Sequence, residues 1–183
     1  MAQTLEFWKV AAQLKTEQRK GWIQGPRIER IESVADHSYC VAVLCLLEAT
    51  ARGYDVGRTL MLALLHDMEE AVIGDLTPSD KRRLTAVGVL RAKTRARSTI
   101  LRTVPSETRK EFRRLWTDLD EGKTREAILV KDVDKLEMAF QASHYEGLGA
   151  PHRFLSKFYK SALARISDDS MNKIVRRLAV ARD

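Results

Sequence analysis

The sequence is poor in the residues that interrupt regular structure. It contains four prolines and nine glycines among 183 residues, which leaves few positions for the turns that separate short strands. A proline inside a helix removes a hydrogen bond and clashes with the preceding turn. Here every proline falls between segments of helical periodicity: Pro26, Pro78, Pro105 and Pro151. The pattern disfavours an all-β fold and predicts an all-α fold of about eight helices.

Cysteine is equally scarce, with Cys40 and Cys45 as the only two. Five residues rise about 7.5 Å along a helix, beyond the ~7 Å Cα separation that a disulfide tolerates. Two unpaired buried thiols are typical of a reducing compartment, so we expect a cytoplasmic protein. The first residues lack a basic patch followed by an apolar stretch, which predicts no secretory signal. No uninterrupted apolar run approaches the ~18 residues of a membrane span, so we expect no membrane partner.

Positive charge is concentrated in one segment of what we expect to be a single domain, residues 1–183. The whole chain carries +7, but residues 81–114 alone carry +10, so the remainder is acidic. A basic helical segment can bind nucleic acid. This one has no aromatic residue before Phe112 and no recognisable nucleic-acid-binding motif. We therefore favour a solvated helix face and expect no nucleic-acid partner.

Periodicity and capping residues predict where the helices lie. Gly53 follows the second helix as a C-terminal cap, and Thr77, Pro78 and Asp80 form a capping box at the start of the fourth. Residues 60–65 are apolar nearly all round, which predicts a central, buried third helix. The expected helices span about residues 4–19, 34–52, 56–73, 79–103, 106–119, 124–147, 151–166 and 167–181.

Side chains that bind metals occur at three separate places. His37 begins the second helix, His66-Asp67 follows the most apolar stretch, and Asp132 and Asp134 lie in the long helix. Ionised groups on buried helices are costly unless they are paired or bind a metal. A single histidine or acidic cluster is more often an ordinary core or surface residue. The coincidence of three such places is what indicates a metal site.

The segments around these residues resemble the HD-domain phosphohydrolases, whose metal signature is H…HD…D. They are similar to the 5′-deoxynucleotidase branch of that superfamily over about residues 10–149. The resemblance implies an all-helical bundle around one divalent metal. The matching segments are RKGW at 19–22, ESVADHSY at 32–39, HDMEEAVIGD at 66–75 and VKDVDKLEM at 130–138.

The resemblance implies four metal ligands: His37, His66, Asp67 and Asp134. It implies that Asp132 is not a ligand. Two imidazoles and two carboxylates with open positions suit six-coordinate Mn²⁺, Co²⁺, Fe²⁺ or Mg²⁺ better than tetrahedral Zn²⁺, which is the less suitable alternative.

The same resemblance implies the groups that act on substrate. Glu70 matches the catalytic glutamate, which deprotonates a water, and Asp75 matches a supporting acid. Arg19 would neutralise the phosphate, because a guanidinium matches phosphate geometry. Trp22 would pack on the sugar and exclude a 2′-hydroxyl, or else anchor its loop in the core. Glu69 stands where many relatives have a small residue, and helical geometry favours Glu70 as the inward-facing glutamate.

The expected function is hydrolysis of deoxyribonucleoside 5′-monophosphates, small-molecule nucleotide substrates, to deoxynucleoside and phosphate. One alternative is an HD-domain hydrolase of another phosphorylated small molecule. A basic nucleic-acid-binding protein is the less favoured alternative. Relatives are commonly dimers, and the long helices carry more apolar residues than one buried stripe needs, so we expect a homodimer.

Overall fold

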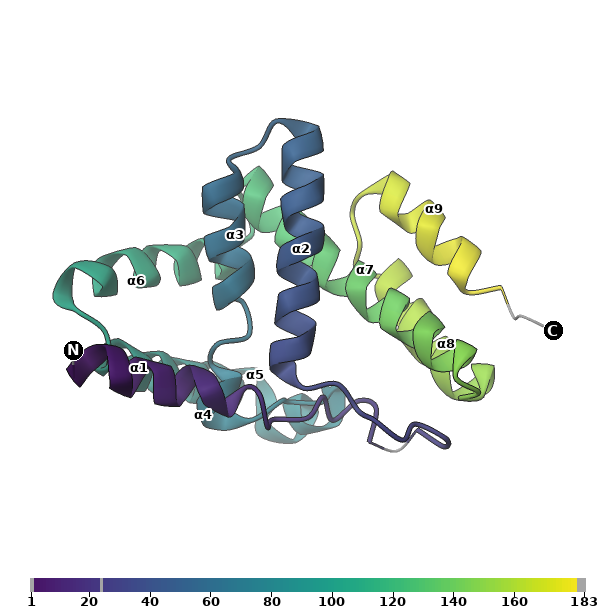
Figure 1. Cartoon of the computed structure of the whole chain (residues 1–183), viewed down its shortest axis with the longest axis horizontal. Coiled ribbons are helices and arrows are strands. Elements are labelled where there is room, and N and C mark those ends of the chain that lie inside the picture. The colour runs from purple at the N-terminus through teal and green to yellow at the C-terminus, as the bar shows by residue number, and fades with distance from the viewer. Residues whose placement is uncertain (1, 24, 181–183) are drawn as a thin grey trace.

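The computed structural model describes residues 2–23 and 25–180 (Figure 1). This part of the chain forms eight helices and one further single helical turn, α4. Its only β-type pairing is an isolated bridge between Gln18 and Ser33. The elements are α1 (Ala2–Gln13), α2 (Val34–Arg52), α3 (Val56–Leu65), α4 (Glu70–Ile73), α5 (Pro78–Arg102), α6 (Ser106–Glu121), α7 (Arg125–Gly147), α8 (His152–Leu163) and α9 (Asp169–Leu178).

The predicted all-α class is confirmed, and several helices begin and end at the predicted caps. Ser33 forms a capping box with Asp36 at the start of α2, and Thr77 forms one with Asp80 at the start of α5. α2 ends at Gly53, whose φ of 65° is in the left-handed region that glycine adopts without strain. Local side-chain chemistry therefore fixes these boundaries.

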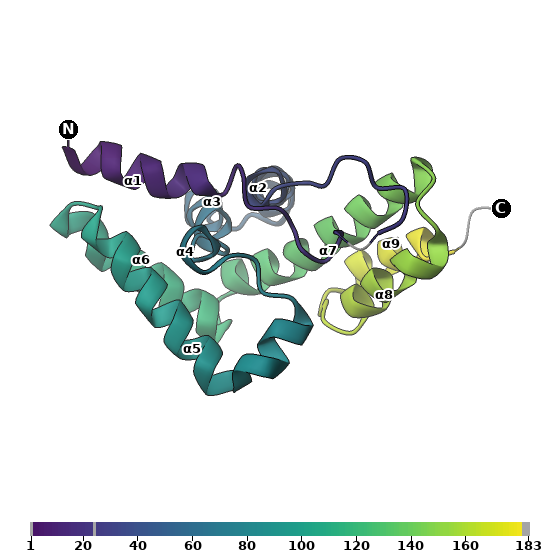
Figure 2. The ribbon, with the colours of Figure 1, turned by 90° about the horizontal axis from the view of Figure 1, so that it is seen from below.

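The core is built around α7, which packs against α2, α3, α6, α8 and α9. Figures 1 and 2 show α2 and α3 on one side of α7, and α8 and α9 along its C-terminal half. By length and composition α2 is the one helix among residues 2–23 and 25–180 that is apolar enough to cross a membrane. In the folded chain α2 packs against α3 and α7 instead.

Two helices end earlier than predicted. α1 ends at Gln13 rather than near Arg19, because the chain turns to place the Arg19 N–H 3.0 Å from the Glu32 carbonyl oxygen. α3 ends at Leu65 rather than at Ile73, and a turn precedes α4. Both corrections change the site: the loop after α1 and the turn after α3 carry its charged side chains.

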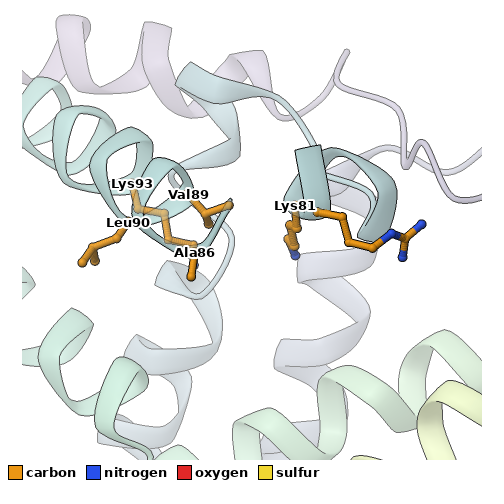
Figure 3. Close-up of a pocket in the computed structure, with 6 residues that line it drawn as sticks. Lys81, Ala86, Val89, Leu90 and Lys93 are labelled. Atoms are coloured by element: carbon orange, nitrogen blue, oxygen red, sulfur yellow. The ribbon is translucent and has the colours of Figure 1, made fainter. Parts of the chain in front are cut away.

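α5 is bent, which the sequence pattern did not predict. Thr85 has φ 64° and ψ 163°, a conformation that costs a β-branched residue about 1–3 kcal/mol. Figure 2 shows the two arms of α5, residues 78–84 and 86–102, meeting at an angle. Figure 3 shows the notch between them, with Lys81 on one arm and Leu90 and Lys93 on the other. The bend directs the first arm toward the site described below.

The two cysteines are free, as expected, but they are not both buried. Cys45 is fully buried in α2, whereas Cys40 is exposed. Burial raises the pKa of the Cys45 thiol to about 12. The expectation that both thiols lie in the core was therefore wrong for Cys40, which lies on a different face of the same helix.

Candidate active site

The four predicted metal ligands come together where α2, α7 and the turn after α3 meet. His37 is fully buried, and its Nε2 lies 3.4 Å from Nε2 of His66 and 3.3 Å from Oδ1 of Asp134. Oδ2 of Asp67 lies 3.2 Å from Nε2 of His66 and 3.7 Å from Nε2 of His37. Ligand atoms of His37, His66 and Asp134 all lie within 4.8 Å of one another. This donor set, two imidazoles and two carboxylates around one point, fits a divalent cation.

Hydrogen bonds fix which nitrogen of each histidine faces this centre. Nδ1 of His66 lies 2.6 Å from the Ala63 carbonyl oxygen, which can only accept, so Nδ1 carries the proton. Nδ1 of His37 lies 2.5 Å from Oε2 of Glu137. Both rings therefore present Nε2 toward the shared centre, as two histidine ligands of one metal must.

Burial and neighbouring groups shift the pKa values of the side chains around this centre. Burial lowers the pKa of His37, but hydrogen bonds to Asp134 and Glu137 outweigh it and raise that pKa to about 9. Burial alone would raise the pKa of Asp67, yet His66 and Arg19 hold it far below its usual value. Burial would also raise the pKa of Asp134, but Lys135 and His37 hold it well below its usual value. Both aspartates are therefore ionised and offer negative charge to a cation.

The adjacent glutamates Glu69 and Glu70 face different surroundings. Glu70 lines a cavity together with Asp67, and its Oε2 is buried with no hydrogen-bond partner among the described residues. Burial, and then the charges of Asp67 and Asp75, raise the pKa of Glu70 to about 9. Glu69 is 1% exposed, and its Oε2 is likewise buried without a partner among the described residues. However, Glu69 does not line the cavity, and its Oε1 accepts a hydrogen bond from Nε of Arg97 at 2.8 Å. Glu70 is thus the glutamate that can act on a bound ligand.

The loop after α1 brings Arg19 to the same cavity. Nη1 of Arg19 donates to Oδ2 of Asp67 at 3.0 Å, and neighbouring carboxylates raise its pKa despite its burial. Asp75 holds this loop in place: its Oδ2 accepts the backbone N–H of Lys20 at 2.7 Å, and its own N–H donates to Glu17 at 2.9 Å. Asp75 therefore positions the arginine loop as well as lining the cavity.

Trp22 lies in the core rather than in the open part of the cavity. It is 1% exposed, and its Nε1 donates to Oε1 of Glu32 at 2.8 Å. Its ring centroid lies 3.8 Å from that of Phe158 and 5.3 Å from that of Tyr145. This placement corresponds to the alternative expectation, a loop anchor, and leaves Trp22 as part of the cavity wall.

Asp132, which the resemblance excludes from the ligand set, has a separate position. Its carboxylate accepts hydrogen bonds from the backbone N–H groups of Ser167 and Asp168 and from the Ser167 hydroxyl. It therefore fixes the turn before α9, while Asp134, two residues along α7, faces the ligand centre.

The cavity has a volume of about 490 Å³, within the range of small-ligand sites, and further residues around it were not predicted from the sequence. Lys81 and Arg82 line it from the first arm of α5, and Lys157 and Arg165 line it from α8 and the segment after it. The α8 contribution has no local signal in the sequence, because it comes from a distant segment. Glu137, by contrast, lies three residues after Asp134, and this helical spacing is a usable signal.

The chain is similar to known proteins over most of its length. The chain is 34% identical to the 5′-deoxynucleotidase HDDC2 of Mus musculus, over 98% of this chain and 88% of the relative. It is 37% identical to the protein of the same name from Dictyostelium discoideum, over 86% and 84% of the two chains. A Pyrococcus horikoshii OT3 crystal structure matches with a TM-score of 0.77 and 29% identity, covering 96% of this chain and 98% of the other. Residues 11–175 match the HD domain family, and the chain belongs to that family.

Proposed function

We propose that this protein is a metal-dependent 5′-deoxynucleotidase, which hydrolyses deoxyribonucleoside 5′-monophosphates to deoxynucleoside and phosphate. The observation that carries the proposal is the shared cavity: Asp67, Asp134, Glu70 and Arg19 all line it. Ligand, base and phosphate-binding groups are therefore available to one small molecule. The names of the relatives supply the substrate class.

The metal site would be held by the Nε2 atoms of His37 and His66 and by the carboxylates of Asp67 and Asp134. A divalent ion there would supply positive charge that stabilises the phosphate and acidifies water. We propose Mn²⁺, Co²⁺, Fe²⁺ or Mg²⁺, because the donor set combines nitrogen with oxygen and leaves positions open. Titration of chelator-treated protein with each ion in turn tests this choice.

The protein groups then have distinct tasks. Arg19 binds phosphate oxygens and offsets their charge, since its guanidinium is always protonated and matches their geometry. A divalent ion bound beside Glu70 would offset the neighbouring negative charges and lower the pKa of this carboxyl. In its ionised form Glu70 would accept a proton from the water that attacks phosphorus. As the water oxygen bonds to phosphorus, the bond to the 5′-oxygen breaks, and that oxygen takes up a proton. Positioning and charge stabilisation are sufficient for this reaction without a covalent intermediate.

The basic rim, which we define as Lys81, Arg82, Lys157 and Arg165, would draw in phosphate-bearing substrates. Within the described part of the chain none of the four forms an ion pair with a carboxylate. Their charge is therefore free to act on a ligand in the cavity. Only the start of the basic segment takes part in this role.

We also propose a homodimer, formed through the outer face of α2 and α3. These two helices contact each other and expose large apolar side chains, including Tyr39 at 70%, Leu47 at 63% and Leu64 at 58%. Large apolar side chains exposed on two neighbouring helices can form an interface between protein chains. Light scattering on wild type and on Leu47→Asp tests it, with a monomer expected only for the variant. A cytoplasmic location in nucleotide metabolism completes the proposal, and cell fractionation tests it.

The decisive assay measures phosphate release from all common 5′-ribonucleotides and 5′-deoxyribonucleotides by the metal-loaded protein. We expect release from deoxyribonucleoside monophosphates. Release only from di- or triphosphates would instead support another HD-domain hydrolase activity. Steeply salt-dependent binding of random-sequence DNA, with no hydrolysis of any nucleotide, would support the nucleic-acid-binding alternative.

A further inference from the structure

We propose that Glu137 is a positioning residue for the metal centre, acting through His37. Its carboxylate holds the His37 ring with Nε2 toward the other ligands and increases the electron density that this nitrogen offers to a cation. The inference rests on the metal site of the proposed function, but not on the identity of the substrate.

Glu137 and His37 are in direct contact between two helices. Oε2 of Glu137, on α7, lies 2.5 Å from Nδ1 of His37, on α2. The exposed fraction is 3% for Glu137 and 0% for His37, so water does not compete for this contact. The other ring nitrogen faces Asp134 at 3.3 Å. Glu137 therefore fixes the ring orientation from the side opposite the ligand centre.

The buried position of the Glu137 carboxylate has a desolvation cost. An ionised carboxylate in an apolar interior is destabilising unless a partner offsets its desolvation. Within residues 2–23 and 25–180, His37 is the only Lys, Arg or His side chain that pairs with the Glu137 carboxylate, to which Nδ1–H can donate whether or not the ring is charged. Glu32, also buried, lies close by, but it cannot offset the charge of Glu137, because it is itself a carboxylic acid. Its Oε1 accepts a hydrogen bond from Trp22. The placement of Glu137 is therefore specific to His37.

The two histidines differ in the group that lies against Nδ1. Nδ1 of His66 is bound by a neutral acceptor, the Ala63 carbonyl, whereas Nδ1 of His37 is bound by a carboxylate. Either acceptor fixes the ring, but only the carboxylate adds negative charge behind the ligand. Partners of this kind typically change metal affinity by about 10–100-fold when they are removed. Glu137 should therefore affect metal binding more than a merely structural core residue would.

The test measures Mn²⁺ affinity by calorimetric titration of the chelator-treated full-length protein. Glu137→Gln keeps the size and an acceptor oxygen of the side chain but removes its charge. The matched control is Glu126→Gln, because Glu126 is also a buried glutamate on α7, about three turns earlier on the same face. Thermal unfolding of the metal-free variants measures any purely structural effect.

We expect Glu137→Gln to weaken Mn²⁺ binding about tenfold or more, while Glu126→Gln binds as wild type does. If Glu137→Gln does not fold, the more conservative Glu137→Asp, whose shorter side chain should lengthen the contact with His37, serves as the second variant with the same expected loss. Wild-type affinity in a folded Glu137 variant would overturn the inference. A wild-type protein that binds Mn²⁺ but hydrolyses no deoxynucleotide would overturn the proposed function and leave this inference intact.

Discussion

The ligand centre around His37 and the basic segment of residues 81–114 are both rich in charge, but they hold it differently. In the centre, His37 is fully buried, the side chains of His66, Asp67 and Asp134 are 8–21% exposed, and these groups lie within about 3–4 Å of one another. In the basic segment most cations face solvent, where salt screens them over about 8–10 Å. Buried charges interact far more strongly because little water separates them. We therefore expect the chemical step to depend on the ligand centre. We expect the basic segment to contribute a long-range field that attracts phosphate-bearing substrates.

One residue connects the two regions. Arg97 of α5 lies in the basic segment, yet its guanidinium pairs with the buried Glu69 at 2.7 Å and with Asp120 of α6 at 2.5 Å. Glu69 directly precedes Glu70, so this pair fixes the single turn α4 against α5 and α6. The basic segment thus supports the site in two ways. Arg97 holds Glu69 by an ion pair, and Lys81 and Arg82 add positive charge at the cavity.

The largest effect should come from Glu70. Glu70→Gln removes the proposed base without changing side-chain size, so kcat for dAMP should fall about 10²–10⁴-fold with metal still bound. Steady-state assays and metal analysis measure the two quantities. The adjacent Glu69→Gln is the control and should keep kcat within about tenfold of wild type. Equal losses in the two variants would contradict the distinction between these glutamates.

Arg97→Ala should have the next largest effect, on stability. It leaves the buried Glu69 with only the more distant Lys93, 3.8 Å away, as a cation, which should lower the free energy of unfolding by roughly 3 kcal/mol. The exposed Arg95, which forms no ion pair within the described part of the chain, is the control, and Arg95→Ala should change stability by less than about 0.5 kcal/mol. Urea unfolding measures both. A stable Arg97→Ala protein would show that α5 is held by packing alone.

Reversing the charge of the basic rim should have a smaller effect. The double variant Lys81→Glu/Arg82→Glu should raise KM for dAMP about tenfold at low salt and leave kcat nearly unchanged, because these cations act through the field around the cavity. The difference should shrink at high salt. Arg91→Glu/Arg95→Glu, on the other arm of α5 and away from the cavity lining, should leave KM within about twofold. A kcat loss in the first variant would place Lys81 or Arg82 in the chemistry.

The smallest effect concerns the bend in α5. Thr85→Gly relieves an unfavourable conformation at φ 64°, so it should raise the free energy of unfolding by about 1 kcal/mol. Thr94→Gly, within the regular part of the helix, should lower it by a similar amount. Thermal unfolding of the pair compares them. Destabilisation by both substitutions would mean that Thr85 is not strained.

The sequence predicted elements where local chemistry decides the structure, and failed where distant contacts do. Thr77 caps α5 through the neighbouring Asp80, and Gly53 ends α2, so both positions followed from the local sequence. The pattern of α3 continues to Ile73, and nothing local predicts that the helix stops at Leu65. In the structure the following turn places His66 3.4 Å from His37 of α2 and Asp67 3.0 Å from Arg19 of the loop after α1. No local pattern specifies these distant contacts.

The candidate site followed the same division. The ligand types and their order were visible in the sequence, and the structure brings His37, His66, Asp67 and Asp134 together. The surroundings of Trp22 were not, because Phe158 and Tyr145 come from α8 and α7. Lys157 reaches the cavity from α8 for the same reason: only the tertiary fold places it there.

The most direct test of the account compares Asp134 with Asp132, which lie on one helix and have different partners. Calorimetric titration of chelator-treated Asp134→Asn and Asp132→Asn with Mn²⁺ measures stoichiometry and affinity. We expect about one ion per chain for Asp132→Asn, since the hydrogen bonds of Asp132 within the described residues go to the turn before α9, and a loss of binding for Asp134→Asn. Wild-type binding by Asp134→Asn, or loss of binding by a folded Asp132→Asn, would contradict it.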